Sequence, residues 1–343
     1  MTLNPILAAR LRASGLLTRR PTVAAVVEQL LAVQAQDEPS TAYSFYLRTG
    51  LSAAAIGAEL AAGAIIRLHL PRPTWHYVRR ADLPVLLTLL SGPLLAVAGR
   101  DRRAMGWQGP TLERALKMLE SLLTAQPRPA AALIDALTPV FPAIGQNRRA
   151  GRHLLQMAEA LGLVGQIGAD YYWLNLPPAP ERSRAERLQE LGARWLAGRA
   201  VASGADLGRW LTLPAADRAL MLAPFPRRRW AGVDYYHSAG EFDAGATFTG
   251  LLPLFDELVL SHRGAEFPGA DALPPPPFVN GQGLLLRANR RLGYYRRPLR
   301  AGQLRFDYQL PPGQALPVEL AAVAADWQRW ASGGGEREAR NQR

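Results

Sequence analysis

Polar and apolar positions in the N-terminal part of the chain alternate with the period of an α-helix. Apolar side chains recur at three- and four-residue spacing over residues 6–13, 23–33 and 53–62, which predicts three helices. Thr22 and Ser52 precede the second and third of these helices, and both are suited to capping a helix N-terminus.

Residues 64–79 break the helical period. Two short runs rich in β-branched and aromatic residues flank Pro71-Arg72-Pro73. Proline on both sides of one residue favours a turn, so the pattern predicts a hairpin. Residues 82–95 then return to a helical pattern.

A linker at residues 106–110 precedes a second unit. Beyond it the pattern predicts helices at 111–123, 130–137 and 147–161, and then two strands within 163–174. Three helices followed by a two-stranded wing is the order of a winged helix-turn-helix. The third helix holds the recognition position, and its N-terminal end, which such helices place in the major groove, is basic.

A proline-rich linker at 177–180 precedes another helical stretch, residues 183–223, with a strand-like end at 227–237. We interpret this stretch as a third unit of the same kind. From residue 240 the pattern changes to short strands and turns, followed by a closing helix over 320–331. The strands are expected at residues 248–254, 259–261, 278–279, 283–287, 292–296 and 303–308, with a polyproline loop at 274–277 and a hairpin turn at Asn280-Gly281.

The sequence therefore predicts an α+β fold, with tandem winged helix-turn-helix units and a C-terminal antiparallel β-domain. The predicted units are residues 1–108, 109–178, 179–239 and 240–331, with a disordered polar tail at 332–343.

The charge of the chain narrows its partners. Forty basic residues stand against 28 acidic ones, which gives a net charge of +12 and a pI near 10.7. Nucleic acid is thus the first partner to consider and an anionic membrane surface the second. All the basic residues except Lys117 are arginine, which suits phosphate contact, although a GC-rich genome also favours arginine.

Several kinds of chemistry are disfavoured. The chain has no cysteine, which excludes disulfides and thiolate-bound metals and fits a reducing cytoplasm. Its five histidines lack the spacing of metal ligands, and it has no phosphate-binding loop, dinucleotide-binding glycine motif or nucleophile elbow. It also lacks an apolar run of about 18 residues and a signal-peptide pattern. We therefore expect no metal, no cofactor and no membrane span.

The most informative motif follows the second predicted helix. Gln34-Ala35-Gln36 ends an apolar run and is followed directly by two carboxylates and a proline. Burying an unpaired amide is costly, so these amides need a use.

At this motif the sequence resembles the AlkZ/YcaQ-like winged-helix DNA glycosylases. Four segments carry the resemblance, and they occur in the same order as in the family. These segments are Val-Gln-Ala-Gln-Asp at 33–37, Leu-Pro-Arg-Pro-Thr-Trp-His-Tyr-Val at 70–78, Leu-Leu-Pro-Leu-Phe-Asp-Glu at 251–257 and Leu-Gly-Tyr-Tyr-Arg-Arg at 292–297. The resemblance implies tandem winged helices closed by a β-domain, and excision of alkylated bases, including interstrand crosslinks. It places the catalytic Gln-x-Gln motif on Gln34 and Gln36. Two positions depart from the family pattern, namely Ala35, where a larger apolar residue also occurs, and His69, where tryptophan is often expected.

The chemistry of glutamine limits the substrate. Its amide accepts and donates hydrogen bonds but does not ionise near pH 7, so it can orient a water without acting as a strong base. An N7-alkylated guanine is already cationic and leaves as a neutral base, so placing water and stabilising an oxocarbenium-like sugar are sufficient. Asp37 or Glu38 can supply negative charge. Alternatively, Asp37 is a surface carboxylate at a helix C-terminus, and the two glutamines make a polar contact to the wing.

The single lysine also discriminates between mechanisms. A glycosylase with lyase activity usually needs an amine to form a Schiff base, and Lys117 lies far from the motif in sequence. We therefore expect monofunctional hydrolysis that leaves an abasic site.

Further residues are candidates for the lesion pocket and the DNA interface. Arg72, Thr74, Trp75 and His76 can form part of the pocket, with Trp75 stacking on a base, or else a structural hairpin. Asp256 and Glu257 are interpreted as structural anchors. The candidate DNA contacts, each of which can equally be solvated surface, are Arg148, Arg149, Arg152, Arg227, Arg228, Arg290, Arg291, Arg296 and Arg297.

Three functions compete. The first is a DNA glycosylase acting on cationic alkylpurines in double-stranded DNA. The second is a non-catalytic winged-helix DNA-binding protein or regulator, and the third is a resistance protein that sequesters a DNA-reactive metabolite. For the first we expect a bacterial cytoplasmic monomer, associated with the nucleoid when bound to DNA.

Overall fold

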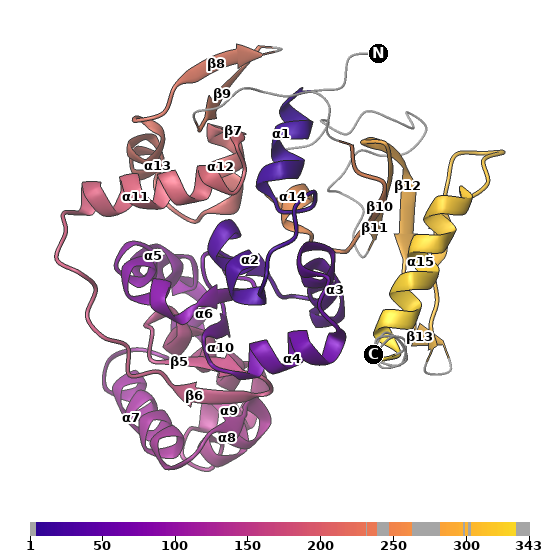
Figure 1. The fold of residues 1–343 in the computed structure, drawn as a ribbon. Coiled ribbons are helices and arrows are strands. Elements are labelled where there is room, and N and C mark those ends of the chain that lie inside the picture. Colours follow the sequence, from indigo (N-terminus) through magenta and orange to yellow (C-terminus); the bar gives the residue numbers. More distant parts are fainter. Residues whose placement is uncertain are drawn as a thin grey trace.

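Helices and antiparallel sheets alternate along the whole chain (Figure 1). The computed structural model describes residues 5–230, 232–238, 247–262, 282–297, 299–300 and 303–333. The chain starts with α1 (Pro5–Ala13), which lies between the first helices and the strands near residue 200 (Figure 1).

The first unit has a distinctive order of elements. It runs helix, strand, helix, helix, strand, strand, namely α2 (Val23–Leu30), β1 (Val33–Gln34), α3 (Glu38–Thr49), α4 (Ala53–Ala61), β2 (Ile65–Leu68) and β3 (His76–Arg79). The last strand, β3, pairs antiparallel with both β1 and β2.

The same strand pairing occurs twice more, in a similar order of elements that has one extra short helix in the second unit. The second unit contains α7 (Gly109–Ala125), β4 (Arg128–Pro129), α8 (Ala130–Leu137), the short α9 (Pro142–Gln146), α10 (Arg148–Ala160), β5 (Val164–Ile167) and β6 (Asp170–Trp173). The third contains α11 (Arg184–Ala197), β7 (Val201–Ser203), α12 (Gly204–Trp210), α13 (Ala215–Leu222), β8 (Arg227–Trp230) and β9 (Val233–His237). In each unit the last strand again pairs with the first two.

Local sequence sets where these helices begin. The predicted caps are confirmed, because the Thr22 hydroxyl accepts a hydrogen bond from the backbone of Ala25 and that of Ser52 from Ala55. Asn147 caps α10 in the same way. These caps satisfy N–H groups that have no partner inside their helix.

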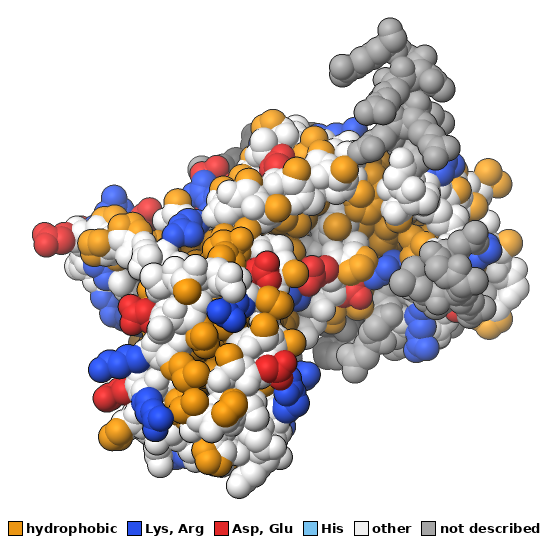
Figure 2. All heavy atoms as spheres, turned by 90° about the horizontal axis from the view of Figure 1, so that it is seen from below, with side chains coloured by type: hydrophobic (Ala, Val, Ile, Leu, Met, Phe, Trp, Pro, Cys, Tyr) orange, Lys and Arg blue, Asp and Glu red, His pale blue; other side chains and the backbone are white. Residues whose placement is uncertain are grey.

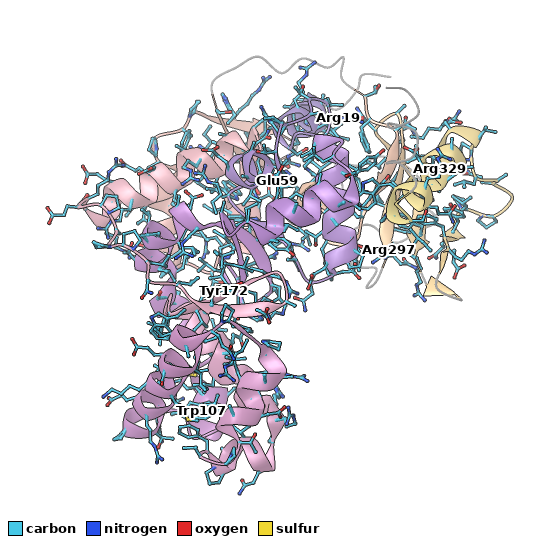
Figure 3. The ribbon with its side chains drawn as sticks, turned by 60° about the horizontal axis from the view of Figure 1, so that its bottom comes forward. Arg19, Glu59, Trp107, Tyr172, Arg297 and Arg329 are labelled. Carbon is cyan, nitrogen blue, oxygen red and sulfur yellow. The ribbon has the colours of Figure 1, made fainter. Side chains whose placement is uncertain are left out.

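The first two units share one sheet of order β1-β3-β2-β5-β6-β4. The units join where β2 pairs with β5, at Arg67 opposite Gln166. Below this junction the second unit forms a lobe. Tyr172 lies near the junction and Trp107 lies within the lobe (Figure 3). The Trp107 indole is buried, and its N–H donates to the carbonyl of Ala150 at 2.9 Å.

Between the first two units lie a 3₁₀ turn (Arg80–Asp82), α5 (Leu83–Val97) and α6 (Gly99–Ala104). By length and composition alone, the stretch Arg80–Val97 is long and apolar enough to cross a membrane. Five leucines of α5 are nevertheless buried. They pack in one core with Leu188 and Trp195 of the third unit, so α5 is a core helix of this fold.

The C-terminal part is an antiparallel sheet covered by a helix. Its four strands are β10 (Gly250–Leu252), β11 (Gly283–Arg287), β12 (Arg290–Arg296) and β15 (Asp307–Gln309), and β13 (Leu299–Arg300) and β14 (Gln303–Leu304) form a small pair beside them. The helix α15 (Val318–Ala331) connects this sheet to the first unit. Its Trp327 stacks on Tyr43 of α3, with ring centroids 3.6 Å apart.

Two predicted elements are wrong. The predicted helix over 23–33 ends at Leu30, because Leu31 has φ 66° and turns the chain into strand β1. The predicted strand at 259–261 belongs instead to a short helix, α14 (Glu257–Leu260), whose first turn is capped by the Asp256 carboxylate. The predicted strand at 278–279, the loop at 274–277, the turn at 280–281 and the tail from 334 lie outside the described residues.

Candidate active site

Gln34 is held by contacts from three parts of the chain. It lies opposite His76 in the β1–β3 pair. Its backbone N–H donates to the Glu257 carboxylate at 2.9 Å, and its backbone carbonyl accepts from the Thr41 hydroxyl at 2.8 Å. Only 5% of the residue is exposed, so these contacts hold a buried residue.

Arg72 fixes the orientation of the Gln34 amide. The guanidinium Nη2 donates to Gln34 Oε1 at 2.6 Å. Since arginine only donates, the atom it meets is the amide oxygen. The amide nitrogen has no hydrogen-bond partner within the described ranges, so its two N–H groups remain available.

Gln36 is held in a similar way but is exposed. Its Oε1 accepts from the backbone N–H of Trp75 at 3.3 Å, and the N–H of Ala35 donates to the Trp75 carbonyl at 2.7 Å. Gln34 ends strand β1, whereas Gln36 lies in the bend that follows it.

His76 supports Arg72 as a neutral ring. Complete burial and, second, the nearby Arg72 charge lower the pKa of His76 well below its usual value of 6.5. Its Nδ1–H donates to the Thr74 carbonyl at 2.7 Å, which leaves Nε2 as an acceptor 3.4 Å from Arg72 Nη2. The Thr74 hydroxyl is itself buried without a partner in the described structure.

Two side chains pack against the ring of Trp75. The Arg67 guanidinium lies over its ring at 4.3 Å, and the His69 ring lies 3.9 Å away. Arg67 also donates to the carbonyl of Ala35 at 3.0 Å, which ties the ring to the glutamine segment.

Asp37 begins a helix rather than ending one. Its Oδ1 accepts from the backbone N–H of Ser40 at 2.9 Å and caps α3, so the interpretation of a helix C-terminal carboxylate is wrong. The same oxygen accepts from Arg297 Nη2 at 2.5 Å. Figure 3 shows Arg297 where the helices of the first unit meet the C-terminal strands. Oδ2 has no partner among the residues that the structure describes.

The sequence did not reveal the arginines that hold the C-terminal carboxylates. Glu257 accepts from Arg199 at 3.4 Å and from the Trp210 indole N–H at 3.1 Å. Asp256 forms two hydrogen bonds with Arg48, at 2.8 and 2.9 Å, and these groups are fully buried. No local pattern could have found these pairs, because about two hundred positions separate Arg48 from Asp256. The contacts agree with the interpretation of both carboxylates as structural anchors.

Comparison with known proteins identifies the family. Residues 27–330 match the family described as DNA glycosylase AlkZ-like. The chain belongs to the AlkZ-like DNA glycosylases. Its fold is similar to that of Streptomyces sahachiroi DNA glycosylase AlkZ, with a TM-score of 0.69 and 16% identity over 96% of each chain. No curated protein matches the sequence.

Membership of the AlkZ-like family makes the chain a DNA glycosylase of DNA repair, with DNA as its partner. The protein offers this partner several exposed arginines. Arg148, Arg149 and Arg152 lie exposed in the first turns of α10, and Arg227 and Arg228 are exposed on β8.

The arginines in β12 and directly after it differ in exposure. Arg290 and Arg296 are exposed. Arg291 is only 7% exposed and donates to the Tyr294 hydroxyl at 2.9 Å, so little of its side chain is open to DNA in this structure. The side chain of Arg297 is 15% exposed and pairs with Asp37, which makes it part of the site rather than of an open surface.

The basic residues do not form one continuous patch on the face in Figure 2, where they are interspersed with acidic and hydrophobic side chains. Some pair with neighbouring carboxylates, as Arg148 does with Asp135 at 2.8 Å. Arg152 has no such partner within the described ranges. The same ranges hold no cluster of three metal-ligating side chains, and Lys117 lies exposed on α7.

Proposed function

We propose that this AlkZ-like glycosylase is monofunctional and hydrolyses the N-glycosidic bond of cationic alkylated purines such as N7-alkylguanine, with water as the nucleophile. One observation carries the proposal. Gln34 and Gln36 each accept from a fixed donor, Arg72 Nη2 or the Trp75 N–H, and each keeps its amide nitrogen unpaired in the described structure.

The proposed role of the two amides is to position water. Each amide oxygen keeps a second lone pair that can accept a proton of the water, while the nitrogens can donate to the sugar or the base. The Arg72 charge makes the Gln34 oxygen a poorer base. The pair therefore places a water without deprotonating it, which fits a substrate whose base is already a good leaving group.

The proposed source of negative charge is Asp37. Its Oδ1 is engaged by Ser40 and Arg297, whereas Oδ2 has no partner in the described residues. An oxygen anchored on one side and open on the other can face an oxocarbenium-like sugar and stabilise its developing charge.

The proposed DNA interface follows from the three repeats. We interpret each helix-strand-helix-helix-strand-strand unit as a winged helix-turn-helix, with α10 in the recognition position of the second unit. Arg148, Arg149 and Arg152 would contact phosphates there, and Arg227 and Arg228 would do so from the third wing. Unhooking of interstrand crosslinks is part of the proposal and requires an open site, because a lesion joined to both strands cannot be flipped out as a single base.

Lys117 lies exposed on α7 in the second unit, and no hydrogen bond or ion pair joins it to the glutamine segment in the described residues. Lyase action needs an amine at the reacting sugar, so this position supports hydrolysis without lyase action. We propose a monomer that acts in the bacterial cytoplasm and associates with the nucleoid.

The test uses the full-length protein and a duplex with one N7-methylguanine. Wild type should release the base and leave an alkali-labile abasic site. Gln34→Ala and Gln36→Ala should each abolish release and still bind the duplex. Gln189→Ala, which changes an exposed glutamine on α11, should match wild type.

The competing function is a non-catalytic DNA-binding protein, favoured by the low exposure of Gln34. It predicts no abasic sites with wild type on either N7-methylguanine or a nitrogen-mustard crosslink. That result would refute the proposed activity on these substrates.

A further inference from the structure

Trp75 also lines a cavity beyond the glutamine motif. The cavity has a volume of about 570 Å³ and lies between the turn that precedes β3 and the helix α10. Aromatic rings of Trp75 and Tyr171 form part of its wall, and Arg149 and Arg152 contribute from α10. The volume exceeds what a methyl group on a base would occupy.

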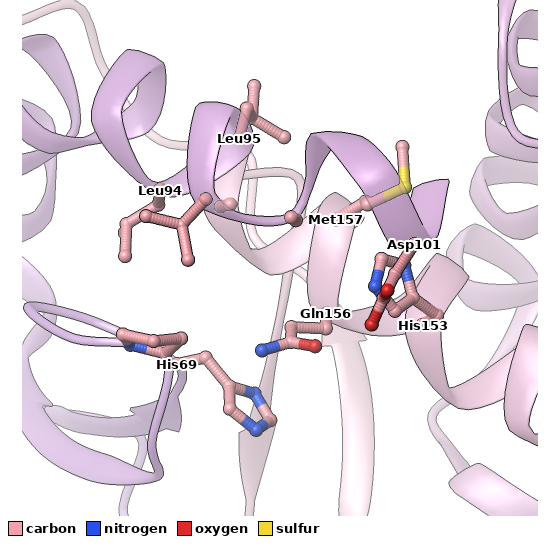
Figure 4. A pocket seen from close by; sticks show the side chains of 11 residues that line it. His69, Leu94, Leu95, Asp101, His153, Gln156 and Met157 are labelled. Carbon is pink, nitrogen blue, oxygen red and sulfur yellow. The ribbon is translucent and has the colours of Figure 1, made fainter. Parts of the chain in front are cut away.

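A smaller chamber of about 150 Å³ adjoins it. Four residues line both, and they are His69, Asp101, His153 and Gln156. The walls of the smaller chamber are otherwise mainly apolar and include Leu94, Leu95 and Met157 (Figure 4). The combined space therefore has an apolar inner end and a more polar outer part.

Two polar groups on the walls are unused. His153 is 7% exposed, and its buried Nδ1 has no hydrogen-bond partner in the described structure. Burial lowers the pKa of His153 below 6.5, so the ring is neutral at pH 7 and can offer one hydrogen bond. The amide of Gln156 likewise makes no hydrogen bond within the described ranges. A buried polar atom without a partner is costly, which points to a ligand that pairs with it.

The cavity is physically joined to the glutamine segment. The Trp75 N–H holds Gln36, while the Trp75 side chain lines the cavity. Gln166, another lining residue, accepts from Arg67 at 2.7 Å, and Arg67 holds the carbonyl of Ala35. Trp75 and Arg67 therefore connect the cavity wall to the glutamine segment, although the glutamines themselves do not line the cavity.

The chemistry of the lesion sets the direction in which its substituent projects. N7 of guanine faces the major groove, so a substituent on N7 projects into that groove. A recognition helix occupies the same groove, and the cavity lies at the N-terminal part of α10.

We propose that this two-chamber cavity binds the substituent of an N7-alkylated purine and selects uncharged, mainly apolar substituents larger than methyl. This assignment rests on the proposed function, because it takes the lesion as bound at Gln34 and Gln36. Leu94, Leu95 and Met157 contact the apolar part of the substituent, and His153 or Gln156 pairs with one polar atom on it.

The test measures binding apart from catalysis. Two duplexes carry N7-methylguanine or N7-benzylguanine on a 2′-fluoroarabino sugar, which blocks cleavage, and fluorescence anisotropy gives the affinity of the full-length protein. Wild type should bind the benzyl duplex at least about 10-fold more tightly than the methyl duplex. Ala98→Leu, which narrows the inner chamber, should reduce this preference about 10-fold. Ala96→Leu on the exposed side of the same helix should leave it unchanged.

Gln156→Trp fills the cavity from the opposite wall and should also remove the preference, which guards against a folding defect in Ala98→Leu. Equal wild-type affinity for the two duplexes overturns the assignment, as does a preference that survives both filling variants. Base release from ordinary N7-methylguanine DNA is measured in parallel. Normal release without a benzyl preference refutes the cavity assignment alone, whereas a benzyl preference without release of either N7-methylguanine or N7-benzylguanine from DNA with ordinary sugars refutes the proposed hydrolysis.

Discussion

Arg72 should matter for both activity and stability. Replacing it with methionine removes the 2.6 Å hydrogen bond to Gln34 Oε1 and leaves a side chain of similar length. A hydrogen bond to a charged group contributes about 1.5–3 kcal/mol. At about 1.4 kcal/mol per factor of ten, losing it should lower the rate of base release about 10- to 150-fold.

The stability of the fold should also decrease. The Arg72 guanidinium is desolvated, and its Nε is buried without a partner in the described structure. Methionine needs no such partner, but it leaves the buried Gln34 oxygen without its donor, so the free energy of unfolding of Arg72→Met should fall by about 1–3 kcal/mol. Arg72→Lys keeps one charged donor and should lose less activity than Arg72→Met.

Single-turnover release of N7-methylguanine at saturating enzyme measures the effect, and urea unfolding measures the stability. Arg182→Met, at an exposed arginine beside α11, is the matched control and should change neither. If Arg72 acts by orienting Gln34, Arg72→Met should add no further loss in the Gln34→Ala background. Additive losses, or an unchanged rate in the single variant, would refute this role.

Three further outcomes are expected. Asp256→Asn should lower the free energy of unfolding by about 3–5 kcal/mol, measured by urea unfolding, because it breaks a buried ion pair. The Arg48 charge helps to hold the pKa of Asp256 below 3.8. The stabilisation by this ion pair in the wild type is therefore present above pH 3.8 and is lost as the pH falls through the lowered pKa. Gly198→Ala should cost about 1–3 kcal/mol, measured as a lower Tm, since a new Cβ would lie 2.2 Å from the backbone oxygen of Gln29. Replacing the three arginines at the start of α10 with alanine should weaken binding to undamaged duplex and lower the salt slope by about 3, and an unchanged slope would remove α10 from the interface.

Local patterns predicted much of the fold. Helical spacing predicted α1, α4 and α10 nearly to their ends, because neighbouring residues determine the caps and the apolar face of a helix. The proline turn gave the β2–β3 hairpin. The end of α2 was missed, since the positive φ of Leu31 is imposed by tertiary contacts rather than by its own preference.

The candidate site was predictable only in part. The sequence suggested Gln34, Gln36 and the residues of the proline turn, which the structure brings together through Arg72 and Trp75. It did not suggest Arg199, because the partners of that side chain come from distant segments. Nor could it show that Asp37 pairs with a side chain of the C-terminal strands, since that contact joins residues 260 positions apart.

The shared six-stranded sheet has a consequence for how this glycosylase can evolve. Strand β1, with Gln34, and strand β4, in the second unit, are opposite edges of one hydrogen-bonded sheet. The spacing between Gln34 and the second unit, which contains α10, is thus set by strand pairing rather than by the connecting segment at 98–109. Insertions or deletions in that segment should leave the spacing intact, whereas the second unit cannot be exchanged for an unrelated DNA-binding module without breaking the sheet. The distance between Gln34 and α10 is therefore inherited together with the sheet.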